Sequence, residues 1–258
     1  MIHLESGPAR VEIDPQQGGR ISALQVAGLD LLCGPGADPL RWGAYPMAPY
    51  AGRVRNGHFQ FEGQSHQLPL RAPPHAMHGT TLDRPWQEAQ PGTLSIDLGP
   101  DWPFPGEARQ RFALDPKGLD VELCILTLGA PFPASVGLHP WFPRQLAQGG
   151  PLVLEFSARE MYVRDSTGVA TPERCPPPAG PWDDCFTGLL GPPRLRWPGA
   201  MTLEIHADTD HWVVYDEPLE SLCVEPMTGP PDALNIAPRL VTREQPLCLQ
   251  TRFVWTLE

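Results

Sequence analysis

Apolar and polar residues alternate with a period of two along the whole chain. Successive side chains of a strand point to opposite faces, so this period is typical of strands with one buried face. The clearest examples are residues 20–26, 108–114, 119–128, 152–156, 201–207, 211–216, 221–225 and 247–257. No window of a dozen residues free of proline and glycine carries an apolar stripe with the helical period. The pattern therefore predicts an all-β protein with very little helix.

Turn residues separate the predicted strands. Residues 115–118, Asp-Pro-Lys-Gly, join two of them and suit a type I turn, and Glu62-Gly63 divides residues 59–70 into two short strands. The 34 prolines and 25 glycines fit many short strands joined by turns. The proline-rich residues 174–182 are expected to form an extended loop, because the strand pattern resumes directly after them. We therefore expect one β-sandwich domain over residues 1–258.

The net charge of the chain limits the kinds of binding partner that we expect. The formal net charge of −11 and the absence of any run of Lys or Arg disfavour a nucleic acid or an anionic membrane surface. No apolar segment is long enough to span a bilayer, and the first residues lack the basic and apolar regions of a signal peptide. We expect a cytoplasmic monomer or homodimer with no nucleic-acid and no membrane partner.

The spacing of the cysteine, histidine and glycine residues disfavours several kinds of functional site. The six cysteines contain no C-x-x-C pair, and reduced thiols are expected in a chain of this length. A zinc site built from His75, His78 and His139 is an alternative, but the spacing does not make these imidazoles converge, so no metal is predicted. Neither a G-x-S-x-G motif nor a glycine-rich phosphate loop is present.

Two titratable residues stand directly before a proline in an apolar segment. His139 precedes Pro140, and Glu225 precedes Pro226. Because proline cannot donate to a sheet ladder, we expect both strands to end there and the side chain of Glu225 to face a cleft. A partly buried glutamate and a histidine titrate near neutrality, which suits acid/base chemistry. A satisfied core histidine and a solvated glutamate at the rim are the alternatives.

Five segments resemble, in order, the motif blocks of the aldose 1-epimerase (galactose mutarotase) family. They are APYAGRVRNGHFQFEGQSHQL at 48–68, HAMHGTTLDRPW at 75–86, VGLHPWFP at 136–143, WDDCF at 182–186 and VEPMTGPPDALN at 224–235. The resemblance implies a β-supersandwich fold, in agreement with the strand pattern. It also implies an isomerase that interconverts the α and β anomers of a monosaccharide such as galactose or glucose, without cofactor or metal.

The resemblance also assigns roles to residues. It implies Glu225 as general base, His139 as general acid, His78 as a second histidine of the site, Arg53 as a donor to the sugar and Asp183 as an acceptor. Ring opening needs one proton removed from the C1 hydroxyl and another delivered to the ring oxygen. We therefore expect His139 to be protonated and Glu225 ionised near neutral pH.

Other assignments stay open. Asp184 is a rival of Asp183, and Trp141 or Trp86 is a candidate apolar face for the sugar ring. Gly52 and Thr80 replace the asparagine and the second glycine usual in the family. Arg55, Arg84 and Arg144 would suit a phosphate if they clustered, so a hexose-6-phosphate 1-epimerase is one alternative. A non-catalytic carbohydrate-binding or sugar-sensing protein of the same fold is another.

Overall fold

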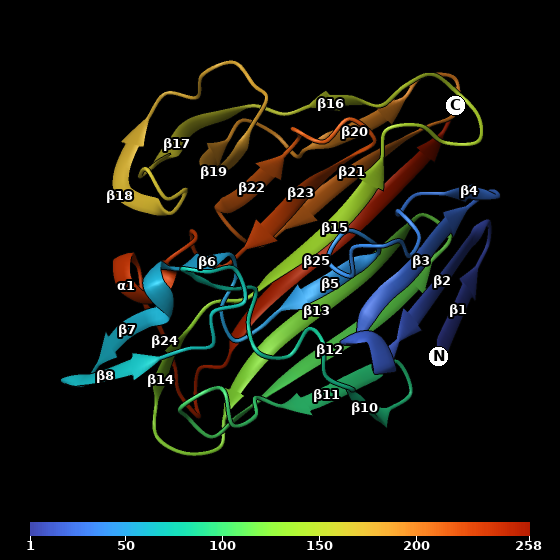
Figure 1. Ribbon diagram of the computed structural model, residues 1–258. Coiled ribbons are helices and arrows are strands. Elements are labelled where there is room, and N and C mark those ends of the chain that lie inside the picture. The colour runs from blue at the N-terminus through green and yellow to red at the C-terminus, as the bar shows by residue number, and fades with distance from the viewer.

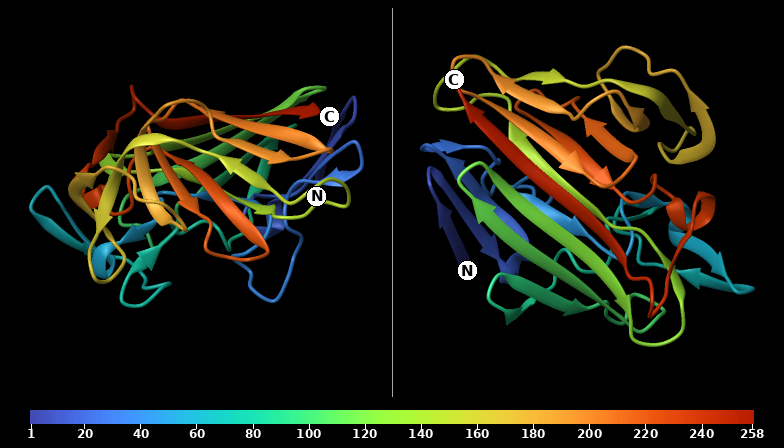
Figure 2. Two further views of the ribbon diagram at one scale, coloured as in Figure 1. Left: turned by 90° about the horizontal axis from the view of Figure 1, so that it is seen from above. Right: turned by 180° about the vertical axis from the view of Figure 1, so that it is seen from behind.

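Two antiparallel sheets packed face to face make up most of the protein. The computed structural model describes residues 1–258, and its strands form one sheet of 11 strands and one of eight. Both chain ends lie toward one end of this sandwich, and the segments β6 to β8 and α1 lie at the opposite end (Figures 1 and 2). The predicted all-β fold is confirmed.

The larger sheet carries the residues on which the functional argument depends. Across the sheet its strands are β1 (Ile2–Ser6), β2 (Ala9–Asp14), β3 (Arg20–Val26), β5 (Ala44–Met47), β15 (Gly137–Pro143), β23 (Ser221–Met227), β22 (His211–Tyr215), β19 (Asp183–Leu189), β17 (Ala158–Arg164) and β18 (Ala170–Cys175), with β4 (Leu29–Asp30) beside β3. Its central strands come from distant parts of the chain, so the middle of the sheet joins segments that the sequence separates.

The smaller sheet covers the other face. Its strands are β10 (Gln87–Gln90), β11 (Thr93–Asp97), β12 (Gly106–Asp115), β13 (Gly118–Thr127), β25 (Leu247–Leu257), β21 (Met201–Ala207), β20 (Arg194–Trp197) and β16 (Val153–Glu155). Three short pairs lie outside the sandwich sheets: β6 (Arg53–Val54) with β9 (Ala76–Met77), β7 (His58–Phe61) with β8 (Gln64–Gln67), and β14 (Phe132–Ala134) with β24 (Arg239–Val241). Helical segments are limited to η1 (Pro15–Gln17), η2 (Arg55–Gly57) and α1 (Ala233–Ile236).

The main core lies between the two sheets. Along β15, Leu138 and Phe142 enter this core, and along β23 Leu222 and Val224 do the same. The residues between them turn to the opposite face of the larger sheet, because side chains of a strand alternate. That outer face is also buried, so β15 and β23 show no exposed side and their sequences read as apolar runs.

Most of the strongly alternating segments are strands, as predicted. The hairpin of β12 and β13 turns at Pro116 and Lys117, and β7 and β8 pair around Glu62-Gly63. The loop predicted for residues 174–182 covers residues 176–182, because Arg174 and Cys175 belong to β18. The predicted strand ends at the two prolines are wrong: β15 runs through Pro140 and β23 runs through Pro226.

The prediction of six reduced thiols is also wrong. Cys124 in β13 lies opposite Cys248 in β25, and the two form a disulfide, while the other four cysteines are free. Alternation had placed these two cysteines on strands, but only the pairing of strands distant in sequence brings them together. None of the helices has the length and apolar composition needed to cross a bilayer.

Packing between the sheets predicts where stability is concentrated. Phe142 of β15 is fully buried and contacts Phe253 of β25, with ring centroids 6.4 Å apart, so it joins the two sheets. Phe142→Ala is expected to lower the free energy of unfolding by about 3–5 kcal/mol, through lost burial and the cavity left behind. Denaturant unfolding measures this loss. Leu219→Ala, at a residue 92% exposed, is the control and should change stability by less than about 0.5 kcal/mol; equal effects would contradict the placement.

Candidate active site

A cavity of about 260 Å³ lies on the face of the larger sheet that points away from the smaller one. Its floor is formed by β5, β15, β23, β22 and β19, and its walls by loops and by β17. The volume lies just below the range of roughly 300–1,000 Å³ that is typical of cavities for drug-sized molecules. The cavity therefore suits a small polar ligand.

Strand register places one row of side chains directly across the cavity floor. Tyr45 pairs with His139, Glu225 pairs with Val213, and Val213 pairs with Cys185. The β15–β23 pairs on either side, Gly137 with Met227 and Trp141 with Cys223, set His139 opposite Glu225. All five residues of this row line the cavity. The two residues singled out before prolines are thus cross-strand neighbours.

A second row lies two residues further along the same strands. In it Trp141 pairs with Cys223, Cys223 with Tyr215, and Tyr215 with Asp183. Trp141, Tyr215 and Asp183 line the cavity, whereas Cys223 is fully buried between them in the register. The rings of Trp141 and Tyr215 contact each other at 5.9 Å between centroids.

His139 and Glu225 form a buried pair at the centre of the floor. His139 Nε2 lies 3.3 Å from Glu225 Oε1, and the two residues are 5% and 3% exposed. The imidazole stacks against Tyr45 on one neighbouring strand, at 4.7 Å, and against Trp141 on its own strand, at 5.3 Å. His139 Nδ1 has no hydrogen-bond partner that could orient the ring. The two aromatic contacts therefore set the plane of the imidazole.

Burial changes the expected protonation of this pair. Desolvation raises the pKa of Glu225 well above its usual value and lowers the pKa of His139 well below its usual value. The fully charged pair expected from the sequence is therefore not the form that this environment favours. The pair is better described as holding one proton between the two side chains, with the carboxyl as its favoured resting place.

His78 approaches the pair from a loop. Its ring lies edge-on to that of His139, with centroids 5.1 Å apart, and its backbone has a positive φ of 59°. Such a backbone is uncommon for a residue other than glycine and is often found at functional sites. Burial lowers the pKa of His78 to about 3, so the imidazole is neutral at neutral pH and adds no charge beside His139.

Arg53 and Asp183 meet on one wall of the cavity. Arg53 Nη1 lies 3.8 Å from Asp183 Oδ2, and the β6–β9 pair sets Arg53 beside Met77, next to His78. Burial raises the pKa of the Asp183 carboxyl, against the opposing effect of Arg53. Asp183 lies on the same side of β19 as Cys185 and shares the cavity floor with Glu225. The structure thus gathers Glu225, His139, His78, Arg53, Asp183 and Trp141 around one cavity.

Arg164 is a cavity residue that the sequence did not reveal. Its Nε lies 2.7 Å from Asp184 Oδ1, and its Nη1 donates to Asp183 Oδ2 at 3.1 Å. One guanidinium therefore holds both acidic residues, and it leaves Asp183 Oδ1 without an intramolecular partner. This arrangement favours Asp183 over Asp184 as an acceptor for a ligand. Alternation within residues 158–164 was the available signal, since it sets Tyr162 and Arg164 on one face.

Tyr45 is a second cavity residue missed from the sequence. Burial raises the pKa of its hydroxyl well above the usual value, so Tyr45 is neutral. Arg20 supports it from below: its guanidinium lies 4.9 Å from the Tyr45 ring and 4.1 Å from the Trp42 ring. Arg20 also donates to the carbonyls of Trp42 and Pro39, and so holds the loop that carries Asp38 and Arg41 to the rim.

The two departures from the family pattern have local structural consequences. Gly52 has a φ of 67°, and a Cβ added there would lie 3.0 Å from Pro231, so this backbone favours glycine. Thr80 donates its hydroxyl hydrogen to the carbonyl of Leu98 at 2.8 Å and does not line the cavity. Thr80 thus anchors the loop after His78 and takes no part in ligand contacts.

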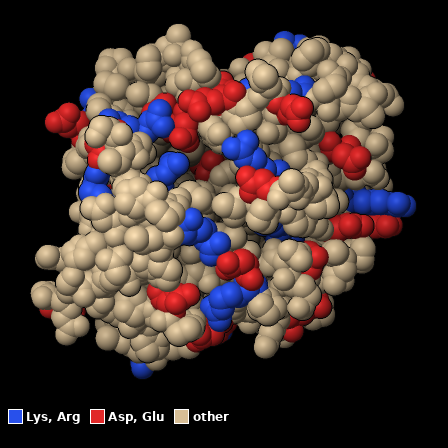
Figure 3. Space-filling model, viewed as in Figure 1, with Lys and Arg blue, Asp and Glu red and all other residues tan.

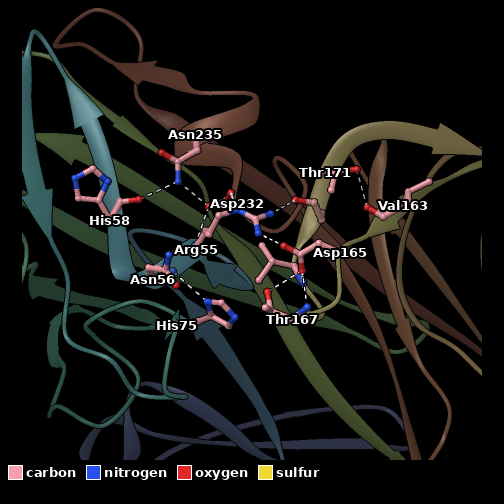
Figure 4. A network of polar contacts seen from close by, with 12 residues as sticks. Arg55, Asn56, His58, His75, Val163, Asp165, Thr167, Thr171, Asp232 and Asn235 are labelled. Carbon is pink, nitrogen blue, oxygen red and sulfur yellow. Dashed lines mark hydrogen bonds and ion pairs between the residues drawn. The ribbon is translucent and has the colours of Figure 1, made fainter.

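A network beside the cavity joins three loops (Figure 4). Arg55 forms ion pairs with Asp165 and with Asp232, and donates to the carbonyl of Ala170 at 3.2 Å. Asp232 is 1% exposed, and its carboxylate accepts from the backbone N–H of Arg55 at 2.9 Å and from Asn235 at 2.7 Å. We call Arg55, Asp165, Asp232 and Asn235 the rim network. Asp232 and Asn235 are the first and last residues of the D-A-x-N end of the last motif block, so this part of the motif has a structural role.

The rim network holds Arg53 in place. The backbone N–H of Asp232 donates to the carbonyl of Arg53 at 2.6 Å, and the carboxylate of Asp232 accepts from the backbone N–H of Arg55. On the other side, Asp165 accepts from the N–H groups of Thr167 and Val169 within its own turn. Gly168 and Ala170 of that segment line the cavity, as does Gly52 on the segment that carries Arg53. The network therefore ties the two walls together.

Other residues considered from the sequence lie elsewhere. Arg84 donates to the carbonyl of Asp97, and Arg144 donates to the carbonyls of Pro218 and Asp216, so these two do not cluster with Arg55. Trp86 is buried in the main core, which leaves Trp141 as the tryptophan of the cavity. His75 accepts from the N–H of Asn56 and does not line the cavity, so the three-histidine site is not formed.

Charge on the molecular surface is mixed. Acidic and basic side chains intersperse over the face shown in Figure 3, without a broad patch of one sign. Inside the cavity the same balance holds, because Arg41 pairs with Asp38 at 3.2 Å, and Arg53 and Arg164 pair with Asp183. The lining therefore presents hydrogen-bonding groups with little net charge.

Comparison with known proteins identifies a family that matches this chain. Residues 1–155, more than half of the chain, match the profile of the family described as Aldose 1-epimerase. This region contains Arg53, His78 and His139, whereas Asp183 and Glu225 lie beyond it. An uncharacterized protein of Escherichia coli K12, YihR, is 30% identical over 131 residues. That alignment covers 46% of this chain and 42% of the relative, so it spans less than half of either protein.

Solved structures share the fold over nearly the whole chain. A putative aldose 1-epimerase of Escherichia coli K12 superposes with a TM-score of 0.84 at 18% identity, covering 100% of this chain and 99% of the other. Galactose 1-epimerase of Lactobacillus acidophilus NCFM gives 0.80 at 15% identity, covering 99% and 93%. The GalM/aldose epimerase homologue of C. elegans gives 0.83 at 15% identity, covering 99% and 98%. These likenesses confirm the galactose mutarotase-like β-sandwich, and with the profile match they establish that the chain belongs to the aldose 1-epimerase family.

Proposed function

We propose that this protein interconverts the α and β anomers of a neutral aldose by acid/base catalysis. The observation that carries the proposal is the His139–Glu225 pair, 3.3 Å apart and buried at the floor of a cavity of monosaccharide scale. A protein that only bound sugars would have no need of a buried pair that shares a proton. Family membership supports the reaction class, and the cavity lining supports the substrate class.

The pair suits the proton transfers of ring opening. When its one proton lies on His139, Glu225 accepts the proton of the C1 hydroxyl and His139 donates to the ring oxygen. The C1–O5 bond breaks, and the open-chain aldehyde forms with the pair again holding one proton, now on Glu225. Rotation about C1–C2 presents the other face, and the reverse transfers close the ring. The reaction consumes no proton and no electron.

The surrounding groups are placed to hold the sugar. Arg53 provides donors and Asp183 an acceptor for sugar hydroxyls, and the polar hydroxyls replace water around the pair when the cavity fills. Trp141 and Tyr45 line the floor with apolar surface on either side of His139. Because the walls are joined by the rim network, these groups are positioned before the ligand arrives, which reduces the ordering needed for binding.

The paired arginines favour a neutral substrate. Each guanidinium of the cavity already has a carboxylate partner, and Arg84 and Arg144 donate to backbone carbonyls away from it. A phosphate would require an unpaired cluster of guanidinium groups, or would break existing ion pairs. We therefore propose a neutral pyranose in preference to a hexose 6-phosphate.

Removal of either proton-transfer group tests the mechanism. Glu225→Gln and His139→Asn are each expected to lower kcat by at least about 100-fold, the scale of general acid/base contributions, while sugar binding is retained. Polarimetry or NMR of freshly dissolved α-glucose or α-galactose measures turnover, and calorimetry measures binding. Glu220→Gln makes the same substitution at an exposed position just before β23 and should keep full activity. Turnover close to that of the unmodified protein in either site variant would refute the assignment.

The pH profile tests the shared proton. Acid adds a second proton to the pair only below the lowered pKa of His139, and base removes its proton only above the raised pKa of Glu225. Hence kcat/KM should stay level between about pH 7 and about pH 6, although a free imidazole titrates near pH 6.5. Initial rates of anomer interconversion across this range give the profile. A change with a midpoint near pH 6.5 would show that His139 is not desolvated as described.

A substrate panel tests the charge argument. Glucose, galactose and arabinose are compared with glucose 6-phosphate at equal concentration and ionic strength. We expect at least one neutral sugar to give a kcat/KM about tenfold or more above that of the phosphate. A preference for glucose 6-phosphate would mean that the cavity ion pairs open to receive an anion. No acceleration with any sugar of a broad panel would exclude the proposed function itself.

A further inference from the structure

The thiol of Cys223 lies beside the His139–Glu225 pair and has no part in the proposed reaction. With the pair it makes a group of three side chains that could bind a metal ion. His139, Cys223 and Glu225 each offer one donor atom, a ring nitrogen, a thiol sulfur and a carboxylate oxygen, and these atoms lie within 4.8 Å of one another. All three residues are buried. Cys223 stands two residues before Glu225 on β23, so alternation brings its side chain to the same face of the sheet.

The spacing is close to that of a tetrahedral metal site. Zinc binds nitrogen and oxygen at roughly 2.0–2.2 Å and thiolate sulfur at about 2.3 Å, so its ligand atoms are about 3.2–3.6 Å apart. The nitrogen–oxygen separation of His139 and Glu225 is already 3.3 Å. The Cys223 sulfur, which lies within 4.8 Å of the other two atoms, would have to move closer to them to complete this geometry. Glu225 and His139 line the cavity and Cys223 does not, so the fourth position would face the cavity.

We propose that His139, Cys223 and Glu225 form an inhibitory site for Zn²⁺ or another thiophilic divalent cation at the floor of the sugar cavity. Binding would release two protons, one from the His139–Glu225 pair and one from the Cys223 thiol. The two anionic ligands then balance the charge of the cation, so the buried site stays neutral. The bound ion occupies both proton-transfer groups and excludes the sugar.

The residues around His139 are better suited to a Zn²⁺ ion that binds reversibly and inhibits than to one that is held permanently as a cofactor. A histidine that holds zinc tightly usually donates its second ring N–H to a carboxylate or a carbonyl, and loss of that partner weakens affinity about 10–100-fold. His139 Nδ1 is buried and has no such partner. We therefore expect Zn²⁺ to leave when a chelator is added.

Calorimetric titration with ZnCl₂ in the absence of sugar tests the site without relying on turnover. The unmodified protein should bind one Zn²⁺ through this site, and Cys223→Ser should lower the affinity at least about 100-fold. Cys185→Ser is the matched control, because Cys185 is also buried on the same face of the sheet, and it should keep the affinity of the unmodified protein. Equal affinity in the unmodified protein and Cys223→Ser, or no binding at all, would overturn the proposal.

Two further readouts keep the test decisive. With Co²⁺ in place of Zn²⁺, the unmodified protein should show a thiolate-to-cobalt absorption band in the near ultraviolet; binding without this band would contradict a cysteine ligand even if Cys223→Ser failed to fold. Where turnover is measurable, Zn²⁺ should inhibit competitively with the sugar and EDTA should restore activity, whereas Cys223→Ser should resist inhibition. If no sugar is turned over but Zn²⁺ binding depends on Cys223, the proposed function fails and the metal site stands.

Discussion

The register of β15 against β23 is the constraint on which the candidate site depends. It sets His139 opposite Glu225 and holds their side chains on the face away from the main core. A slip of one residue in either strand would turn its titratable side chain into the core and bring Leu138 or Val224 out, exchanging apolar contacts for a buried polar group. The apolar residues between the sheets therefore fix the site, although none of them touches the cavity.

Both strands pass through a proline directly after the titratable residue that they place in the cavity. Pro140 and Pro226 have no N–H to give to the ladder, so the pairing around them is held by bonds further along. The sheet tolerates this because β5 and β22 support the two strands on their outer sides. The local gap in the ladder coincides with the point where the sheet carries its two titratable side chains, in accord with the tendency of functional sites to break local rules.

The sequence named most of the residues that the structure gathers around the cavity, but it placed the ends of the surrounding strands less well. Alternation identified β3, β12, β13, β21 and β25, whose faces differ in polarity. The end of β15 was misplaced because Pro140 was expected to stop the strand, and the apolar run beyond it shows no alternation that would have corrected this expectation. The motif blocks supplied Arg53, His78, His139, Asp183 and Glu225. Arg164, Tyr45 and the disulfide of Cys124 with Cys248 depend on which strands become neighbours, and that information is not local.

The rim network has a consequence for the order in which the protein can assemble. Arg55 contacts residues from two later segments of the chain, Asp165 and Asp232, and Glu225 itself belongs to the last third of the sequence. During synthesis residues 1–139 bring His78 and His139 out of the ribosome before Asp183 and Glu225 have been made. Contacts between such distant segments form late, since the chain must first lose the entropy of closing long loops. The cavity is thus among the last parts of the protein to be completed, and an incomplete chain lacks a finished cavity.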